Sequence, residues 1–376
     1  MSAEAADAVA PAPGIVRLPG YDVTVEAGAL ARLGAIAAAA APAHRYVVVT
    51  DTTVGRLHGA TVLAGFPEGR THLLEIPPGE GEKTRERWAR LTDGMLALGC
   101  ARDTTVVALG GGVVGDLAGF TAATFMRGVP VVQAPTTLLA MVDASVGGKT
   151  AVDVPAGKNL VGAFHPPAAV VADPLVLATL PDADRRAGLA EVLKHGVIAD
   201  AAYLERTLEL LPLLLDPACS GSAGVAEVVR RSVEIKAAVV AADEREGGLR
   251  KTLNFGHTLG HAVEQLSGYR LLHGEAVAIG MALESRLAER LGVAAAGTAG
   301  RVERAIRAAG LPTRVPVGMT PASIVAATRS DKKRRAGTVE YALPATVGRM
   351  AGAERGWGVP VPDDEVERML AATAAG

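Results

Sequence analysis

Three of the chain's eight histidines lie between positions 257 and 273, and their types suit metal chemistry. His257 and His261 are four residues apart, so on a helix both side chains face the same side. Glu191 lies in an earlier segment with helical apolar spacing. Together with it, these imidazoles form a ligand set suited to a zinc ion that keeps one coordination position open. The spacing favours His257 and His261 as a pair and does not decide whether His273 replaces one of them. The alternative is that they are surface or hydrogen-bonded core side chains.

A glycine-rich turn suggests the binding of a phosphate or a dinucleotide. Gly110, Gly112 and Gly115 form a G-x-G-x-x-G pattern between the strand-like segment Thr104–Leu109 and the helix-like segment Val113–Thr124. In this context the glycines allow close approach of a pyrophosphate, and the helix N-terminus offers N–H groups to it. Because the chain has 44 glycines, chance matches to the pattern are also expected.

The acid that contacts a ribose in many such sites is missing from its usual place. The next strand-like segment, Val129–Gln133, does not end in Asp or Glu. The candidates elsewhere are Asp51, at the end of an earlier strand-like run, and Glu80, which shares a loop with Lys83. Spacing alone equally predicts that Asp51 caps a helix.

Five cations lie beside glycines, beside an asparagine or in apolar helix-like segments: Lys149, Lys158, Lys194, Lys236 and Arg250. Taken singly, each is typical of a solvated surface charge. Collected in one cleft, they would bind a phosphate and a carboxylate, and arginine offers bidentate geometry.

The segments that must position these residues are of two kinds. Before about position 180, short β-branched runs alternate with helix-like stretches, which predicts a doubly wound, Rossmann-like α/β domain. The runs are Tyr46–Thr50, Thr104–Leu109, Val129–Gln133 and Ala169–Val171. From about Asp182 helical spacing dominates, apart from a strand-like piece at Thr338–Leu343. We expect a disordered extension at 1–14, a nucleotide-binding α/β domain at 15–180 and an all-α domain at 181–376.

Composition restricts the class of partner. The net charge is −2 with no Lys/Arg run, which argues against nucleic acid. The longest apolar runs, such as Leu210–Leu215, are too short to cross a bilayer, so no membrane partner is expected. The N-terminus lacks the apolar core of a signal peptide, and Cys100 and Cys219 suit a reducing compartment. These features predict a cytoplasmic protein.

Ordered blocks from Asp51 to Asp331–Lys333 resemble the 3-dehydroquinate synthase family of the sugar phosphate cyclase superfamily. They include GGGVVGDLAGF at 110–120, DASVGGKT at 143–150, GLAEVLK at 188–194, NFGHTLGHAVE at 254–264 and HGEAVAIGM at 273–281. The resemblance implies a lyase that needs NAD and one divalent metal, zinc or cobalt, with its site between two domains. Its reaction would convert 3-deoxy-D-arabino-heptulosonate 7-phosphate to 3-dehydroquinate and phosphate. The steps are transient oxidation by NAD, elimination, reduction, ring opening and aldol closure.

The resemblance also implies roles for individual residues. The metal ligands would be Glu191, His257 and His273, and His261 would contact the substrate instead. Cofactor contacts would be Asp51, Glu80, Lys83, Gly112, Val113, Val114, Gly115, Asp116, Thr136, Thr137, Lys149, Lys158 and Thr179. Catalytic or substrate contacts would be Asp143, Lys149, Asn159, Lys194, Lys236, Arg250, Asn254, His261 and one lysine of Lys332–Lys333. Arg127 is expected to reach a phosphate across a homodimer interface.

Some positions depart from the family pattern and keep other substrates open. Ala144, Asp153 and His165–Pro166 stand where Ser, Asn and Tyr-Gln are more usual. An amino-substituted analogue of the substrate, or another sugar phosphate, is therefore an alternative. A polyol dehydrogenase of the glycerol dehydrogenase kind would consume NAD and would not need the cations. A non-catalytic NAD sensor should have lost some of these polar residues.

Overall fold

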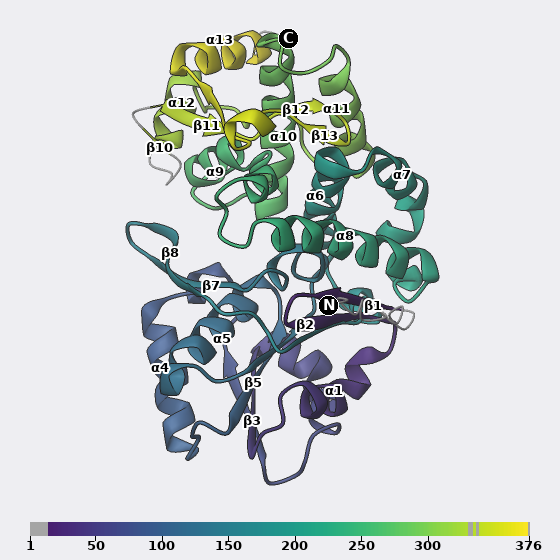
Figure 1. Ribbon diagram of the computed structural model, residues 1–376, viewed down its shortest axis with the longest axis vertical. Helices are drawn as coiled ribbons and strands as arrows, with labels where there is room; N and C mark the ends of the chain where they lie inside the picture. Colours follow the sequence, from purple (N-terminus) through teal and green to yellow (C-terminus); the bar gives the residue numbers. More distant parts are fainter. Residues whose placement is uncertain (1–13, 330–333, 336–337, 375–376) are drawn as a thin grey trace, which may run out of the picture.

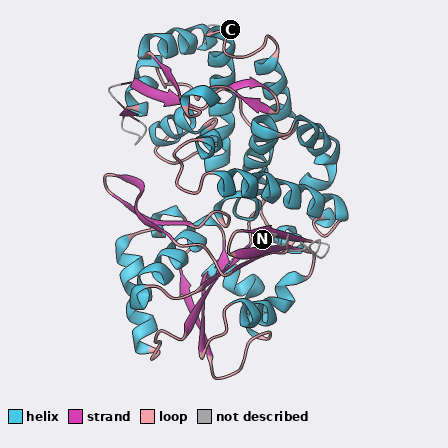
Figure 2. Ribbon diagram, in the orientation of Figure 1, coloured by secondary structure: helices cyan, strands magenta, loops and turns pink. Residues whose placement is uncertain are grey.

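The computed structural model describes residues 14–329, 334–335 and 338–374. The expected N-terminal extension, apart from Gly14, and the Lys332–Lys333 pair lie outside these residues. Figure 1 shows an α/β half that carries the N-terminal part of the chain and a mainly helical half that carries the C-terminal part. In Figure 2 the long strands gather in the first half. The predicted fold class, a Rossmann-like domain followed by a helical one, is confirmed.

The α/β half is built on a seven-stranded sheet with the spatial order β1-β2-β9-β6-β5-β3-β4. All neighbours from β2 to β4 are parallel, and only β1 is antiparallel to β2. The strands are β1 (Ile15–Leu18), β2 (Tyr21–Val25), β3 (Arg45–Asp51), β4 (Thr71–Ile76), β5 (Thr104–Gly110), β6 (Val131–Pro135) and β9 (Ala169–Ala172). The four β-branched runs correspond to β3, β5, β6 and β9, while β1, β2 and β4 were not predicted.

Helices cover both faces of this sheet. Along β5, Val107 packs into one hydrophobic cluster with helix α1, and Val106 packs into a second cluster with α4 and α5. Alternate residues of a strand point to opposite faces, so both faces are buried, as a doubly wound fold requires. The α-helices of this half are α1 (Leu33–Ala40), α2 (Thr52–Val54), α3 (Ala60–Leu63), α4 (Arg85–Ala97) and α5 (Gly112–Thr124), and its shorter turns include the π-turn η5 (Ala140–Ala144).

A β-hairpin that the sequence did not reveal leaves the sheet and lies beside the helical half. Its strands are β7 (Lys149–Val154) and β8 (Gly157–Phe164), which pair antiparallel. Figure 1 shows it projecting from the α/β half toward α9. The hairpin carries three of the polar residues singled out above, Lys149, Lys158 and Asn159.

The second half consists mainly of helices, and its first helices share a hydrophobic cluster with the sheet. The helices are α6 (Asp182–Ala199), α7 (Ala201–Leu215), α8 (Ala223–Ala242), α9 (His257–Leu266), α10 (His273–Arg290), α11 (Thr298–Ala308), α12 (Pro321–Thr328) and α13 (Asp363–Ala374). The strand-like piece near Thr338 forms β11 (Thr338–Tyr341), between β10 (Arg334–Arg335) and β14 (Val359–Val361); β12 (Pro344–Thr346) pairs with β13 (Arg349–Met350). Among the described residues, no helix is both long and apolar enough to cross a membrane.

Helices α9 and α10 approach each other at backbone distance because glycines line their contact. A Cβ on Gly280 would overlap the Gly256 carbonyl oxygen and lie 2.7 Å from the Gly260 nitrogen. The buried carboxylate of Glu284, on α10, accepts hydrogen bonds from Gly256 N at 2.7 Å and Leu259 N at 3.0 Å. It thereby satisfies N–H groups that the start of α9 leaves without helical partners. This packing fixes where His257 begins α9.

Gly280→Ala should therefore destabilise the fold. The added methyl must push the start of α9 away from α10, and overpacking of this kind costs about 1–3 kcal/mol or more. Gly300→Ala is the matched control, because its Cβ would meet only the tip of Arg304 at 3.4 Å within helix α11. It should be neutral or stabilising by up to about 1 kcal/mol. Urea unfolding of both variants checks the difference, and equal stabilities would contradict this view of the α9–α10 contact.

Candidate active site

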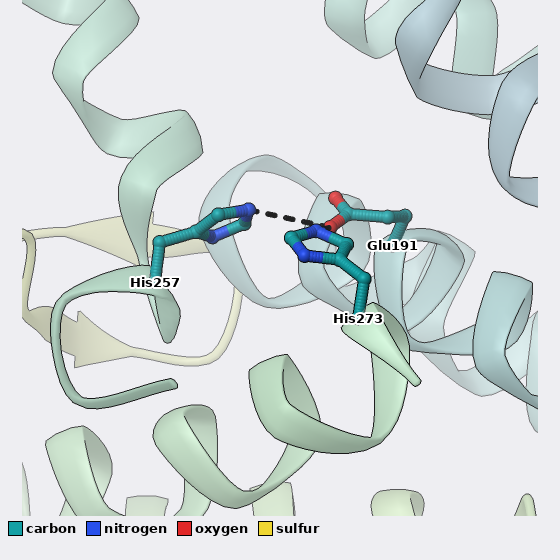
Figure 3. Close-up of side chains that lie close together, drawn as sticks. All are labelled: Glu191, His257 and His273. Atoms are coloured by element: carbon teal, nitrogen blue, oxygen red, sulfur yellow. Dashed lines mark ion pairs between the residues drawn. The ribbon is translucent and has the colours of Figure 1, made fainter. Parts of the chain in front are cut away.

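Three helices bring Glu191, His257 and His273 together. Glu191 lies in the middle of α6, while His257 and His273 are the first residues of α9 and α10. The Nε2 atoms of His257 and His273 lie 3.4 Å and 3.6 Å from Oε1 of Glu191. Figure 3 shows both imidazole rings directed toward this carboxylate. Because one ligand atom of each side chain lies within 4.8 Å of the others, the three form a group that can hold a metal ion.

The charge state of this group is set by burial and by Lys194. Glu191 is fully buried, and burial raises the pKa of its carboxyl, but Lys194 and the two imidazoles outweigh burial and hold that pKa well below its usual range. Lys194 forms an ion pair with Oε2, yet neither carboxylate oxygen has a well-aligned hydrogen bond within the described part of the chain. Burial, together with Lys194, lowers the pKa of His257, so its imidazole is neutral. Burial lowers the pKa of His273, but Glu191 and Glu264 outweigh it and raise that pKa to about 9, so a cation must displace a proton from this imidazole. The ionised carboxylate and the neutral imidazole of His257 are already in the form that binds a cation.

His261 lies beside the same cluster. Its ring centroid is 5.2 Å from that of His257 and 5.8 Å from that of His273. With Glu264 and His273 it forms a second group of metal-type geometry. The spacing-based pair His257 and His261 therefore does lie on one side of α9, while the buried carboxylate of Glu191 contacts His257 and His273.

Next to this cluster, residues from both halves enclose a cavity of about 120 Å³. Its wall comprises Asp143, Lys149, Lys194, Lys236, Glu246, Arg250, Leu253, Asn254 and His257. Four of the five cations named from the sequence are thus collected in one place, whereas the fifth, Lys158, is not part of the wall. Asn159, Arg127 and His261 do not line it either.

Opposite charges meet in this wall. Lys236 Nζ lies 2.7 Å from Asp143 Oδ1. Burial lowers the pKa of Lys236, and Asp143 opposes that shift. Arg250, which is 2% exposed, donates to the carbonyl oxygens of Glu244 at 2.5 Å and Gly147 at 3.1 Å. Its guanidinium is therefore held in place on one side while another side meets the cavity.

Glu246 is a cavity residue that the sequence did not single out. Its carboxylate forms an ion pair with Lys149 and accepts a hydrogen bond from Asn254 Nδ2 at 2.5 Å. Its backbone φ is +62°, a left-handed value that a residue with a side chain seldom adopts. In the sequence Glu246 lies in a charged loop, DEREGG, whose pattern does not distinguish it from a surface residue. Only its tertiary position reveals that it lines the cavity.

The glycine turn has the geometry that its pattern predicts. Gly110 ends β5, Gly111 caps α5, and α5 begins at Gly112, so the N-terminus of α5 opens at the carboxyl end of the sheet. A Cβ on Gly115 would lie 2.9 Å from the Gln133 side chain, so close packing requires glycine there. Asp116 pairs with the buried Lys83 at 2.5 Å.

Other cofactor candidates have roles within the fold. Asp51 caps α2 by accepting from the Thr53 and Val54 amides at 2.9 Å and 3.0 Å, which is the alternative that its spacing allowed. Lys83 also donates to Asn159 at 2.6 Å, which puts this expected substrate residue beside the glycine turn.

The remaining candidates lie around the same strand ends or at the surface. Thr136 N bonds Gly110 O at 2.9 Å, Thr137 Oγ1 accepts from Ala140 N at 3.1 Å, and Thr179 Oγ1 is 3.1 Å from His58 Nε2. Arg127 is exposed, with a left-handed φ of +68°.

Known proteins resemble this chain along most of its length. Residues 73–187 match the family described as 3-dehydroquinate synthase N-terminal, and residues 188–334 match 3-dehydroquinate synthase C-terminal. A 3-dehydroquinate synthase of Synechococcus sp. is 45% identical over 359 residues, covering 94% of this chain and 96% of its own. One from Gloeobacter violaceus is 43% identical over 364 residues, covering 95% and 98%.

Solved structures give the same architecture. A 2-epi-5-epi-valiolone synthase from Streptomyces hygroscopicus, with NAD⁺ and Zn²⁺ bound, has a TM-score of 0.82 at 33% identity and covers 96% of this chain and 98% of its own. A 2-deoxy-scyllo-inosose synthase with carbaglucose-6-phosphate, NAD⁺ and Co²⁺ also scores 0.82, at 25% identity, with coverages of 94% and 97%. A probable glycerol dehydrogenase from Sinorhizobium meliloti scores 0.65 at 18% identity, covering 94% and 96%, and shares the fold. The matches along nearly the whole chain show that it belongs to the 3-dehydroquinate synthase family.

Proposed function

We propose that this chain converts 3-deoxy-D-arabino-heptulosonate 7-phosphate to 3-dehydroquinate and phosphate. The observation that carries the proposal is one cavity whose wall joins His257, of the metal-type cluster, to the cations Lys149, Lys194, Lys236 and Arg250. A phosphorylated sugar acid has two anionic ends and hydroxyls between them. Cations on several sides of a cavity beside a metal-type group are complementary to such a molecule.

The residues present fit a divalent ion and NAD. The buried, ionised carboxylate of Glu191, with lone pairs that no aligned donor occupies, and the imidazoles of His257 and His273 would hold the ion. The N-terminus of α5 with Gly112, Val113, Val114, Gly115 and Asp116 would hold the pyrophosphate. Around it we place Asp51, Glu80, Lys83, Thr136, Thr137, Lys149, Lys158 and Thr179. When bound, the ion supplies a Lewis acid and NAD a temporary hydride acceptor.

The side chains of the cavity would bind and orient the substrate. Lys194, whose pKa burial lowers but Glu191 and Asp143 raise more strongly, stays charged and would hold an anionic oxygen. Lys236, held by Asp143 in an ion pair, would lie close to the reacting or phosphate end of the substrate. Arg250 would hold the carboxylate. Lys149, Asn159, Asn254 and His261 would complete the contacts, with Arg127 from the partner subunit of a homodimer.

The reaction itself gives the first test. Full-length protein, loaded with Zn²⁺ or Co²⁺ and supplied with catalytic NAD, should release one phosphate for each carbocyclic product over many turnovers. NADH should not accumulate, because the hydride taken from the substrate is returned to it. Phosphate assay, product analysis and absorbance at the NADH band measure the three quantities. A rise in NADH equal to the substrate consumed would instead make the chain a dehydrogenase.

The ligand set can be tested by metal content. His273→Ala should remove stoichiometric metal, because Nε2 of His273 faces Glu191 Oε1. His261→Ala should keep the metal and lose activity through substrate contacts. Elemental analysis after gel filtration distinguishes the two variants. Should His261→Ala lose the metal while His273→Ala retains it, the pair suggested by spacing alone would be the right one.

Arg250 decides between an acid substrate and a neutral sugar phosphate. Loss of a charge-assisted hydrogen bond costs roughly 1.5–3 kcal/mol, or about tenfold to a hundredfold or more in kcat/KM. Arg250→Ala should show this loss with the acid and a much smaller loss with an analogue that lacks the carboxylate. Because Arg250 also binds two backbone carbonyls, thermal unfolding and NAD binding serve as controls. Equal losses with both compounds would give Arg250 a purely structural role.

A further inference from the structure

Glu264 is a buried carboxylate near the site to which neither the metal set nor the substrate contacts assign a role. It lies on α9 and is 4% exposed. Its Oε1 is 2.9 Å from Lys158 Nζ, and its Oε2 is 3.6 Å from His273 Nδ1. Glu264 therefore lies between a proposed metal ligand and a lysine of the α/β half.

The orientation of the His273 ring gives Glu264 a chemical consequence. Nε2 faces Glu191 at 3.6 Å, and Nδ1 faces Glu264 at the same distance. A neutral imidazole that offers the Nε2 lone pair to a metal must carry its proton on Nδ1, which is the atom directed at Glu264. A carboxylate in this place fixes the tautomer, holds the ring plane and makes the ligand more basic.

Lys158 connects this carboxylate to the other half of the molecule. It belongs to β8, in the hairpin that Figure 1 shows projecting toward α9. Its Nζ also lies 3.3 Å from Glu80, in the loop before α4, and 4.6 Å from the centre of the Tyr269 ring. Tyr269 has a left-handed φ of +59°, so the chain just after α9 holds an unfavourable conformation where it meets Lys158. The contacts Glu80–Lys158–Glu264–His273 form one continuous path between the halves.

We infer that Glu264 is a positioning residue for the metal site: it sets the His273 imidazole for metal binding, and Lys158 adjusts that setting from the α/β half. The inference rests on the metal site of the proposed function. It makes the affinity for metal depend on a residue that contacts no metal and on a second residue that belongs to the other half of the chain. Such coupling between two sites is reciprocal, so the affinity for any ligand that binds at Lys158 also depends on whether the metal is bound.

Metal affinity tests the inference without turnover. Full-length protein is freed of metal, and its affinity for Zn²⁺ and Co²⁺ is measured by competition with a chromophoric chelator. Glu264→Ala should weaken binding about 10- to 100-fold, the usual cost of losing an outer-sphere partner. Glu264→Gln should lie between it and the unmodified protein, because its amide oxygen still accepts from Nδ1–H but carries no charge.

A matched control separates positioning from general loosening of the fold. Glu289→Gln, on α10, removes the charge of another carboxylate, one that accepts from Ala299 N at 2.8 Å away from the site. It should leave metal affinity within about twofold, even if its unfolding temperature falls as much as that of Glu264→Ala. If Glu264→Ala also binds metal within about twofold of the unmodified protein, the inference is wrong. If Glu289→Gln also lost tenfold in metal affinity, the effect of Glu264→Ala would reflect a general loss of stability and not positioning of His273.

A double-mutant cycle tests the link across the two halves. Lys158→Met should change metal affinity severalfold when Glu264 is present and should have no effect in the Glu264→Ala background. Effects that multiply, or no effect in either background, would overturn the part assigned to Lys158. This measurement involves neither substrate nor turnover. Its outcome can therefore be interpreted even if the protein is inactive on the heptulosonate phosphate.

Discussion

A carboxylate with no exposed surface, that of Glu191, sets the terms for the rest of the site. A buried charge costs several kcal/mol unless it is paired and hydrogen-bonded, so it persists only where opposite charge surrounds it. Here Lys194 comes from the next turn of the same helix, and His257 and His273 come from two others. The fold tolerates an ionised group at this point because Lys194 and the two imidazoles lie against it, and a bound divalent ion, as proposed, would add further positive charge.

The packing that surrounds the Glu191 carboxylate explains two other features, the glycines between α9 and α10 and the backbone contacts of Arg250. The glycines between α9 and α10 let two helix starts meet over α6, so that both imidazoles reach one oxygen. Arg250 ties the segment before α9 to Gly147, next to the β7–β8 hairpin, and thereby joins the anion-binding wall to the α/β half. The charges of the cavity are consequently shared between the two halves, and the cavity exists only when both are in place.

The sequence predicted the parts with strong local signals and missed those that depend on tertiary contacts. The strands β3 and β5 could be identified because each is a short, β-branched, apolar run. The glycine turn could be identified because its pattern lies between a strand-like and a helix-like segment. The hairpin β7–β8 could not be identified, because glycines and lysines obscure its alternation and β8 has no buried residue. The sequence permitted two ligand pairs, His257 with His261 or His257 with His273. Helical spacing could not decide between them, because it does not show which imidazoles face Glu191 on α6. Glu246 and Glu264 had no signal of their own, because a charged loop and a helix face look alike whether solvent or a cation meets them.

We propose that Glu191, His257 and His273 together hold a divalent ion at the junction of the two halves. Diffraction from crystals grown with NAD and Zn²⁺, recorded on both sides of the zinc absorption edge, locates the ion directly. We expect one anomalous peak bonded to Glu191 and to Nε2 of His257 and His273, at the Zn–O and Zn–N distances of about 2.0–2.2 Å usual for zinc. A peak bonded to His261, Glu264 and His273, or full NAD occupancy with no peak at Glu191, would contradict it.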